Sequence, residues 1–169
     1  MPLKIRPEVP EDRTAVFEIN RMAFGRDDEA QLVDRLRDDG DVVLSLVAVD
    51  GGEIVGHVLF SPLVVHTASK PVAAVALAPI AVLPAHQRQG IGAQLIRHGL
   101  SMLTDAGHRI VTVLGHPEYY PRFGFTPEAA RDLEVPFAGP AWMAQELVPG
   151  SLDGVSGRVE YPQAFGIGR

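Results

Sequence analysis

The sequence predicts a single α+β domain in which a mixed, mostly antiparallel sheet is flanked by helices. Apolar residues recur at helical spacing in three segments, whereas other segments alternate or run apolar over strand lengths. Short runs rich in glycine, proline and acidic residues separate these segments, as expected for turns. No repeat, low-complexity segment or linker interrupts the 169 residues. We therefore expect one domain over residues 1–169, with a core of about 3–147 and a C-terminal extension over 148–169.

Helices are predicted where acidic residues precede an apolar stripe and where a glycine follows one. Acidic side chains in a first turn complement the helix dipole, and glycine is a common residue just after the last turn. The predicted helices run from Pro10 to Gly25, from Asp27 to Gly40 and from Gly90 to Ala106. The expected apolar stripe of the first helix is Val16, Ile19, Ala23 and Phe24. Between Pro117 and Phe123 there is room for no more than two helical turns.

Strands are predicted where apolar residues alternate with polar ones or form short continuous runs. The sequence Asp50-Gly51-Gly52 is a hairpin turn between two of them. The run Val72–Val82 is dense enough in Ala and Val for a central strand that is covered on both faces. The other predicted strands are Leu3–Arg6, Val42–Val49, Glu53–Phe60 with a continuation over Leu63–His66, Arg109–Leu114, Trp142–Val148 and Arg158–Tyr161.

Composition narrows the functional classes. With 15 Lys and Arg against 21 Asp and Glu, the net charge is −6, which disfavours nucleic-acid binding because phosphate contacts need clustered cations. The absence of cysteine excludes disulfides, thiol nucleophiles and cysteine-based metal centres. The six histidines show no His-x-x-x-His spacing, so no metal site is predicted. No stretch approaches the roughly 20 apolar residues of a membrane span, and we expect a cytoplasmic protein.

The most informative segment joins a strand, a loop and a helix. The strand Val75–Val82 leads into a loop, and Gly90-Ile91-Gly92 opens the helix. Glycines at the mouth of a helix leave backbone N–H groups accessible, and with the helix dipole these groups form an anion site. The alternative is that the glycines only start a tightly packed helix. The Rossmann fingerprint fails because Leu95 stands where a third small residue is needed, and Ala93 excludes the ATPase phosphate loop.

Two motifs resemble those of a known family. The sequence Gln87-Arg88-Gln89-Gly90-Ile91-Gly92 resembles the Gln/Arg-x-x-Gly-x-Gly/Ala signature of the GNAT superfamily of acyl-CoA N-acyltransferases. Downstream, Tyr120-Pro121-Arg122-Phe123-Gly124-Phe125 resembles the Tyr-x-x-x-Gly-Phe that closes the acetyltransferase core. The run Val113–Tyr120 looks like a bacterial branch of predicted acetyltransferases and lacks the Asn-containing helix start common in the family. The resemblance covers about residues 3–147 and implies a GNAT-like fold with a splayed central pair of strands.

This resemblance implies a binding site for acetyl-CoA, with CoA as the product. In the family, the pantetheine arm pairs with the strand before the loop, and Ile80, Ala81 and Val82 match those positions. Pro79 independently indicates a break in the sheet, because proline lacks an N–H group and belongs at a bulge or an unpaired edge. Arg88 either adds a cation toward the nucleotide 3′-phosphate or is a solvated loop side chain. The residues expected to hold the pyrophosphate on their backbone N–H groups are Gln87, Arg88, Gln89, Gly90, Ile91, Gly92 and Ala93.

The resemblance also implies direct attack of an amine on the thioester, with the oxyanion held by a backbone N–H of the splayed strand. Tyr120 matches the tyrosine that protonates the leaving thiolate, whereas Tyr119 lies one position off the motif. The alternative for Tyr120 is an aromatic ring that packs on the cofactor. For the general base, His116 is a candidate, and Glu29 and Glu118 are alternatives; each of the three also has an ordinary structural role open to it.

The function predicted is an N-acetyltransferase that transfers an acetyl group from acetyl-CoA to a primary amine of a small molecule or peptide. The alternative is a non-catalytic acyl-CoA-binding sensor or structural module, in which Tyr120 or the Gly-x-Gly sequence would be dispensable. The expected partner is the amine acceptor, with no nucleic acid and no membrane, and a homodimer is compatible with the sequence. The segment after Gly124 either completes the acceptor pocket through Trp142 and Tyr161 or packs as core.

Overall fold

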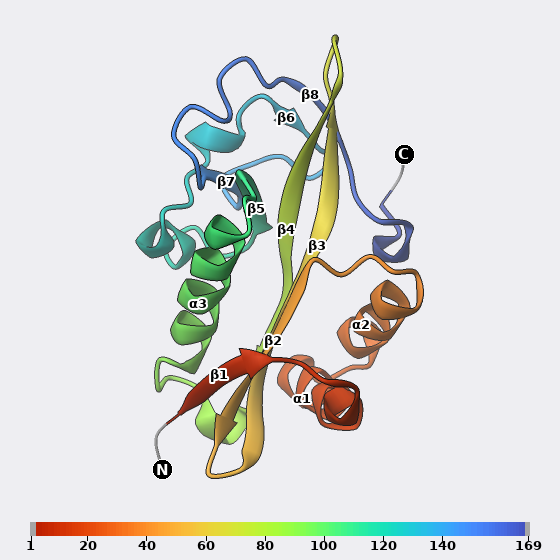
Figure 1. The fold of residues 1–169 in the computed structure, drawn as a ribbon, viewed down its shortest axis with the longest axis vertical. Coiled ribbons are helices and arrows are strands. Elements are labelled where there is room, and N and C mark those ends of the chain that lie inside the picture. The colour runs from red at the N-terminus through yellow and green to blue at the C-terminus, as the bar shows by residue number, and fades with distance from the viewer. Residues whose placement is uncertain (1–2, 168–169) are drawn as a thin grey trace. The chain divides into compact units, whose positions relative to one another are not determined.

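Two consecutive long strands, β3 (Glu53–His66) and β4 (Pro71–Val82), organise the chain (Figure 1). The computed structural model describes residues 3–167 and divides the chain into two compact units. Unit 1 takes Met1–Phe60 and Ala78–Ser101, and unit 2 takes Ser61–Leu77 and Met102–Arg169. Each long strand therefore contributes one part to each unit. The predicted continuation of β3 past Pro62 is confirmed.

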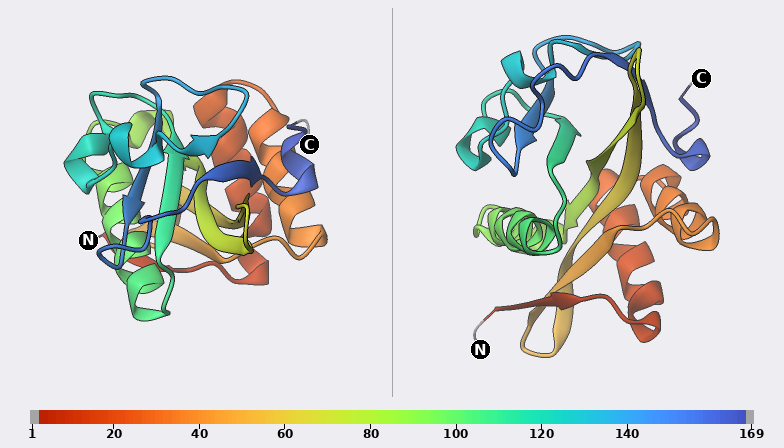
Figure 2. Two further views of the ribbon diagram at one scale, coloured as in Figure 1. Left: turned by 90° about the horizontal axis from the view of Figure 1, so that it is seen from above. Right: turned by 45° about the horizontal axis from the view of Figure 1, so that its top comes forward.

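Unit 1 combines antiparallel strands with helices. Strand β1 (Lys4–Pro7) pairs with β2 (Leu44–Asp50), and β2 pairs with β3 through the Asp50-Gly51-Gly52 turn. Helices α1 (Arg13–Phe24) and α2 (Asp28–Asp38) pack against each other, as Figure 2 shows. Helix α3 (Ile91–Asp105) begins in this unit. All these elements were predicted, with boundaries that differ by a few residues.

The first predicted helix needs two corrections. Residues Pro10–Asp12 form a 3-10 turn rather than the start of the α-helix, which runs from Arg13 to Phe24 and is followed by Gly25 with a left-handed φ of +70°. Val16 and Ile19 are buried as expected, but Phe24 is 39% exposed. Phe24 occupies the last position of the helix, where the chain changes direction. Helical periodicity therefore does not determine whether this side chain is buried.

Helix α3 lies very close to β3 within unit 1. A Cβ atom added to Gly99 would stand 2.5 Å from the ring of Phe60, and one added to Gly56 would stand 3.1 Å from Ile91 and from Leu95. Glycine on the helix and glycine on the strand therefore both permit this approach. Phe60 and Leu95 are fully buried. The first turn of α3 is thereby held against the sheet.

Unit 2 contains the remaining strands. Strand β4 pairs in parallel with β5 (Ile110–Leu114), and β5 pairs antiparallel with β7 (Trp142–Glu146). Strand β8 (Gly157–Glu160) pairs antiparallel with β3 and in parallel with the two-residue β6 (Leu133–Glu134). Both views in Figure 2 show β5 beside β7. The predicted mixed, mostly antiparallel sheet is confirmed, whereas β6 was not predicted.

The segment after Gly124 packs as core. Trp142 is 2% exposed and donates its indole N–H to the Leu133 carbonyl at 3.0 Å. Tyr161 is also buried, and Phe137 contacts both rings. Burial raises the pKa of the Tyr161 hydroxyl well above its usual value. Of the two roles open to Trp142 and Tyr161, the structure supports packing.

Candidate functional site

The loop between β4 and α3 has an unusual backbone. It follows a 3-10 turn over Pro84–His86. Arg88 has a φ of +65°, the only left-handed φ at a non-glycine residue among residues 3–167, and Gly90 has a φ of +81°. Left-handed residues at such turns direct successive N–H groups toward one side, which is how backbone nests bind anions. This strain at a non-glycine residue is typical of functional loops.

The start of helix α3 adds further donors to the loop. The Gln94 N–H makes the first helical bond, to the Gly90 carbonyl at 3.1 Å. No described atom lies within 4 Å of a Cβ built on Gly90, so this side of the loop is open. Helix geometry leaves the N–H groups of the first residues without intrahelical acceptors. These residues are Ile91, Gly92 and Ala93.

Side-chain and backbone bonds tie the loop to the end of β4. Gln87 donates from Nε2 to the Val82 carbonyl at 3.0 Å. The Leu83 N–H donates to the Val55 carbonyl on β3 at 2.9 Å. The Gln87 N–H is directed at the Pro84 carbonyl at 3.4 Å, so it is the least available of the predicted phosphate donors. Gln87 therefore shapes the loop through its side chain.

The strand residues expected to pair with pantetheine lie just before this loop. The β4–β5 ladder covers Val75–Leu77 with Val111–Val113 and does not extend to Pro79 or to Ile80–Val82. Ala81 is buried, while its two neighbours are half-buried. The ladder thus stops before the position where proline predicted a break. Ile80–Val82 and 87–93 all belong to unit 1.

The second motif places Tyr120 in an aromatic cluster of unit 2. The Tyr120 side chain is 7% exposed. Its ring centroid lies 5.2 Å from that of Tyr119, 6.5 Å from Phe123 and 5.9 Å from Phe125, with near-perpendicular planes to Tyr119 and Phe125. Such edge-to-face contacts are favourable beyond simple burial. The cluster holds the phenol ring in one orientation.

The hydroxyl group of Tyr120 stays protonated and accessible. Burial, and secondarily Tyr119, raise the pKa of this phenol to about 12. Its oxygen has no hydrogen-bond partner among the described residues. It is also absent from the set of buried side-chain atoms that lack both a partner and contact with solvent. Within residues 3–167, those atoms are Asn20 Oδ1, Ser61 Oγ, His86 Nδ1 and Thr112 Oγ1. The Tyr120 oxygen is therefore reachable from solvent and carries a proton to donate.

His116 lies at the turn between β5 and this cluster. Its side chain is exposed, and its backbone carbonyl accepts the N–H groups of Tyr119 at 3.1 Å and Tyr120 at 3.3 Å. Glu118 is exposed on the same turn. His116, Glu118 and Tyr120 all belong to unit 2. The structure thus brings the catalytic candidates of the second motif together on one short turn.

Glu29, the third candidate for the base, is already engaged. Both of its carboxylate oxygens accept hydrogen bonds from Arg26, at 2.6 and 3.0 Å. This pairing lowers the pKa of Glu29. A carboxylate held in its ionised form by a guanidinium is a weak base. Asp28 also lies 4.0 Å from Arg26. Arg26 therefore partly neutralises the acidic cluster at the start of α2, which consists of Asp27, Asp28 and Glu29.

Unit 1 contains a buried polar network that the sequence did not reveal. His57 is fully buried on β3, where Asn20 Nδ2 donates to its Nδ1 atom at 3.2 Å. Its Nε2 atom therefore carries the proton and donates to Ser45 Oγ at 2.9 Å. The Ser45 hydroxyl donates to Glu8 at 2.5 Å, and Glu8 pairs with Arg37. Burial, and secondarily Arg37, lower the pKa of His57 to about 3.

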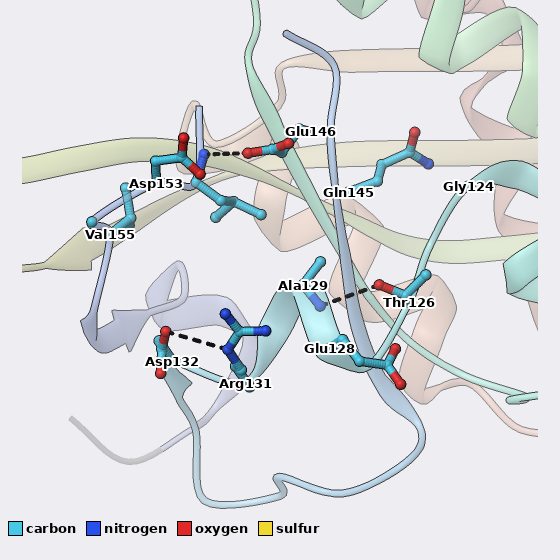
Figure 3. Close-up of a pocket in the computed structure, with 12 residues that line it drawn as sticks. Gly124, Thr126, Glu128, Ala129, Arg131, Asp132, Gln145, Glu146, Asp153 and Val155 are labelled. Carbon is cyan, nitrogen blue, oxygen red and sulfur yellow. Dashed lines mark hydrogen bonds and ion pairs between the residues drawn. The ribbon is translucent and has the colours of Figure 1, made fainter. Parts of the chain in front are cut away.

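A polar hollow of about 680 Å³ lies in unit 2 beside the second motif (Figure 3). None of the predicted site residues lines it. Some of its polar groups are paired: Glu146 accepts the Leu152 N–H at 2.8 Å, and Arg131 lies 3.8 Å from Asp132. It is therefore a surface feature outside the predicted site. In residues 3–167, no cluster of His, Asp and Glu could hold a metal ion, and no helix could span a membrane.

A family model for the acetyltransferase (GNAT) domain matches residues 4–127, more than half of the chain. The chain belongs to the GNAT acetyltransferase family. It is 39% identical over 164 residues to the N-acetyltransferase YhbS of Escherichia coli (strain K12), covering 95% of this chain and 97% of the relative. The predicted family and the predicted activity, N-acetyl transfer, are thereby confirmed.

Two solved GNAT structures are similar along nearly the whole chain. E. coli YhbS in complex with CoA has a TM-score of 0.90 and 38% identity, covering 97% of this chain and 92% of that one. A GNAT acetyltransferase from Brucella melitensis in complex with acetyl-CoA has a TM-score of 0.81 and 35% identity, covering 97% and 98%. The predicted fold class is confirmed.

Proposed function

We propose that this GNAT acetyltransferase binds acetyl-CoA through Ile80–Val82 and 87–93 and acetylates a primary amine of a small molecule or peptide. The observation that carries the proposal is the left-handed backbone at Arg88 and Gly90 beside the open start of α3. The complexes of the two similar proteins with CoA and acetyl-CoA support it. A cytoplasmic location is part of the proposal, because the cofactor is a cytoplasmic metabolite.

The loop residues fit a pyrophosphate. Gly90 adds no side chain to the open face, and the N–H groups of Ile91, Gly92 and Ala93 need acceptors. Ile80–Val82 offer backbone groups beyond the β4–β5 ladder for an extended pantetheine chain. When bound, acetyl-CoA supplies an activated acyl group as a thioester. A backbone N–H of Ile80–Val82 is proposed to stabilise the oxyanion that develops on the acyl carbonyl.

Tyr120 is the proposed general acid. The amine nitrogen forms a bond to the acyl carbon, the C–S bond breaks, and the Tyr120 hydroxyl gives its proton to the departing thiolate sulfur. The raised pKa keeps this hydroxyl protonated at neutral pH. Solvent then reprotonates the tyrosinate. His116 is the proposed acceptor of the ammonium proton, because Glu29 is held by Arg26.

The acceptor is proposed to be a cationic amine, in keeping with the net charge of −6. The acidic cluster at the start of α2 adds little support, since Arg26 pairs with Glu29 and approaches Asp28. An amine panel would identify the acceptor: spermidine, lysine, a lysine-containing peptide, an unblocked peptide amino terminus and tryptamine. Release of CoA thiol is measured for each.

Calorimetric titration with acetyl-CoA, CoA and ATP tests the cofactor site. We expect similar affinities for acetyl-CoA and CoA, because most contacts are to the part that they share, and no binding of ATP at the same concentrations. Equal binding of ATP would contradict the proposed site. Binding of acetyl-CoA without thiol release with any amine would favour an acyl-CoA sensor over an enzyme.

A further inference from the structure

Gly115 lies directly after β5, and its contact with Tyr120 is closer than any side chain would allow. A Cβ atom built on Gly115 would stand 2.2 Å from Tyr120 Cε2, 2.9 Å from Cδ2 and 3.2 Å from Cζ. Carbon atoms in contact normally lie about 3.5–4.0 Å apart. The tyrosine ring therefore occupies the space where a side chain at residue 115 would begin.

Backbone conformation does not explain the glycine. Gly115 is not among the described glycines with positive φ, so its backbone is open to ordinary L-residues. Its N–H group donates to the Ala141 carbonyl at 3.0 Å, which holds this point of the chain in place. The requirement for glycine at residue 115 is thus the close approach of the Tyr120 ring.

Other aromatic rings surround the Tyr120 ring on its remaining sides. Tyr119 and Phe125 meet Tyr120 edge to face, and Phe123 lies on a further side. The Tyr120 N–H is bonded to the His116 carbonyl at 3.3 Å, which restrains the backbone that carries the ring. A close-packed interior accommodates an added methyl group only by displacing its neighbours. An added methyl group at residue 115 would therefore displace the phenol and its hydroxyl.

We propose that Gly115 is a positioning residue for Tyr120: its missing side chain lets the phenol ring lie against the end of β5 and thereby fixes where the hydroxyl group points. This inference rests on the proposed proton-donor role of Tyr120. Displacement of a catalytic group by about 1 Å can cost about 10²-fold in rate. Gly115 acts through Tyr120 and makes no contact with substrate in this scheme.

The decisive experiment is a kinetic double-mutant cycle of Gly115→Ala and Tyr120→Phe. Turnover is followed as CoA thiol released with the best amine of the panel, or as acetyl-CoA hydrolysis if no amine reacts. Gly115→Ala should lower kcat about tenfold or more and leave the acetyl-CoA KM within about twofold. In the Tyr120→Phe background, the same change should lower kcat less than about twofold, because the hydroxyl that it misplaces is already gone.

Gly139→Ala is the matched control in the same unit. A Cβ at Gly139 would meet no described atom within 4 Å, and its φ is not positive, so activity and stability should be unchanged. Parental kcat in Gly115→Ala would overturn the inference. A loss that is equally large in the Tyr120→Phe background, or a loss confined to KM, would also overturn it. Parental turnover in Tyr120→Phe alone would instead refute the proton-donor role itself.

A second measurement decides the question if Gly115→Ala folds poorly. Thermal unfolding is compared for Gly115→Ala, Tyr120→Leu and the double variant. If the added methyl group collides with the ring, Gly115→Ala should lower Tm much less in the Tyr120→Leu background than in the parent. If Gly115→Ala lowers Tm equally in the parent and in the Tyr120→Leu background, the added methyl group does not collide with the Tyr120 ring, and the inference is overturned.

Discussion

His57 in unit 1 and Tyr120 in unit 2 are both buried ionisable rings that stay neutral, yet they differ in whether their polar atoms have hydrogen-bond partners. Burial lowers the pKa of His57 to about 3 and raises that of Tyr120 to about 12. Both nitrogens of His57 have hydrogen-bond partners, Asn20 and Ser45. The Tyr120 oxygen has none among the described residues. Burial therefore keeps both rings neutral, but the nitrogens of His57 are used in hydrogen bonds, whereas the protonated Tyr120 hydroxyl has no acceptor among the described residues.

The sharpest test of this difference is Tyr120→Phe. It removes only the hydroxyl and keeps the ring contacts with Tyr119 and Phe125. We expect kcat to fall by about 10²-fold or more, the scale of losing one positioned acid, while CoA affinity and Tm stay near the parental values. Thiol-release kinetics, calorimetry and thermal unfolding measure the three quantities. If the rate is unchanged, the thiolate leaves unprotonated or takes its proton from water.

For His57 the expected effect is on stability rather than turnover. The unfolded chain binds a proton at His57 below about pH 6.5, whereas the folded chain does so only near pH 3, so this group favours unfolding as the pH falls through that window. The loss amounts to about 2 kcal/mol between pH 6.5 and 4.5. In His57→Gln, the free energy of unfolding in urea should be lower at neutral pH but should depend less on pH across this range.

The exposed His98 provides the matched control for that measurement. His98→Gln should leave the pH dependence of stability as it is in the parent. An unchanged slope in His57→Gln would mean that another group dominates acid unfolding. Parental kcat in a folded His57→Gln protein is expected, because the ring is fully enclosed in unit 1.

Cofactor affinity should depend on neither ring but on the start of α3. Gly92→Val places a branched side chain where the pyrophosphate is proposed to approach the backbone. We expect CoA to bind at least tenfold more weakly, about 1.4 kcal/mol. Ser101→Val, an exposed position on the same helix, controls for the helix cost of valine. Unchanged affinity in calorimetry would exclude this loop as the phosphate site.

The smallest effect is expected at Tyr119, beside the proposed acid. Tyr119→Phe should change kcat less than about twofold, because residue 119 lies one position off the motif. Arg122 lies 4.8 Å from the centre of the Tyr119 ring, and phenylalanine preserves that contact. If Tyr119→Phe is slow while Tyr120→Phe is not, the assignment of the acid to residue 120 is off by one position.

Local signals predicted most of the fold. The glycine turn at residues 51–52, the acidic start of α2 and the apolar face of α3 are encoded within a few residues. Strand β6 was missed because its two residues, Leu133 and Glu134, become a strand only by pairing with β8. The strand predicted over Arg158–Tyr161 is β8, but its pairing with β3 was not predicted, because that pairing joins segments far apart in the sequence.

The candidate site was predictable only where its signal is local. Glycine spacing indicated the loop before α3, but the left-handed φ of Arg88 left no trace because that residue is not a glycine. Gly115 and His57 could not be interpreted from sequence either. Their roles depend on which side chain arrives from another element, Tyr120 for the glycine and Asn20 for the histidine.

The division of β3 and β4 between the two units has a consequence for how the protein is made. Unit 1 needs Ala78–Ser101 in addition to the first sixty residues, and unit 2 needs residues close to the end of the chain. A nascent chain therefore cannot complete unit 1 until Ser101 has left the ribosome, and by then Ser61–Leu77 have emerged without their partner strands β5 and β8. During translation, this β3–β4 hairpin therefore exposes the edges that later pair with β5 and β8.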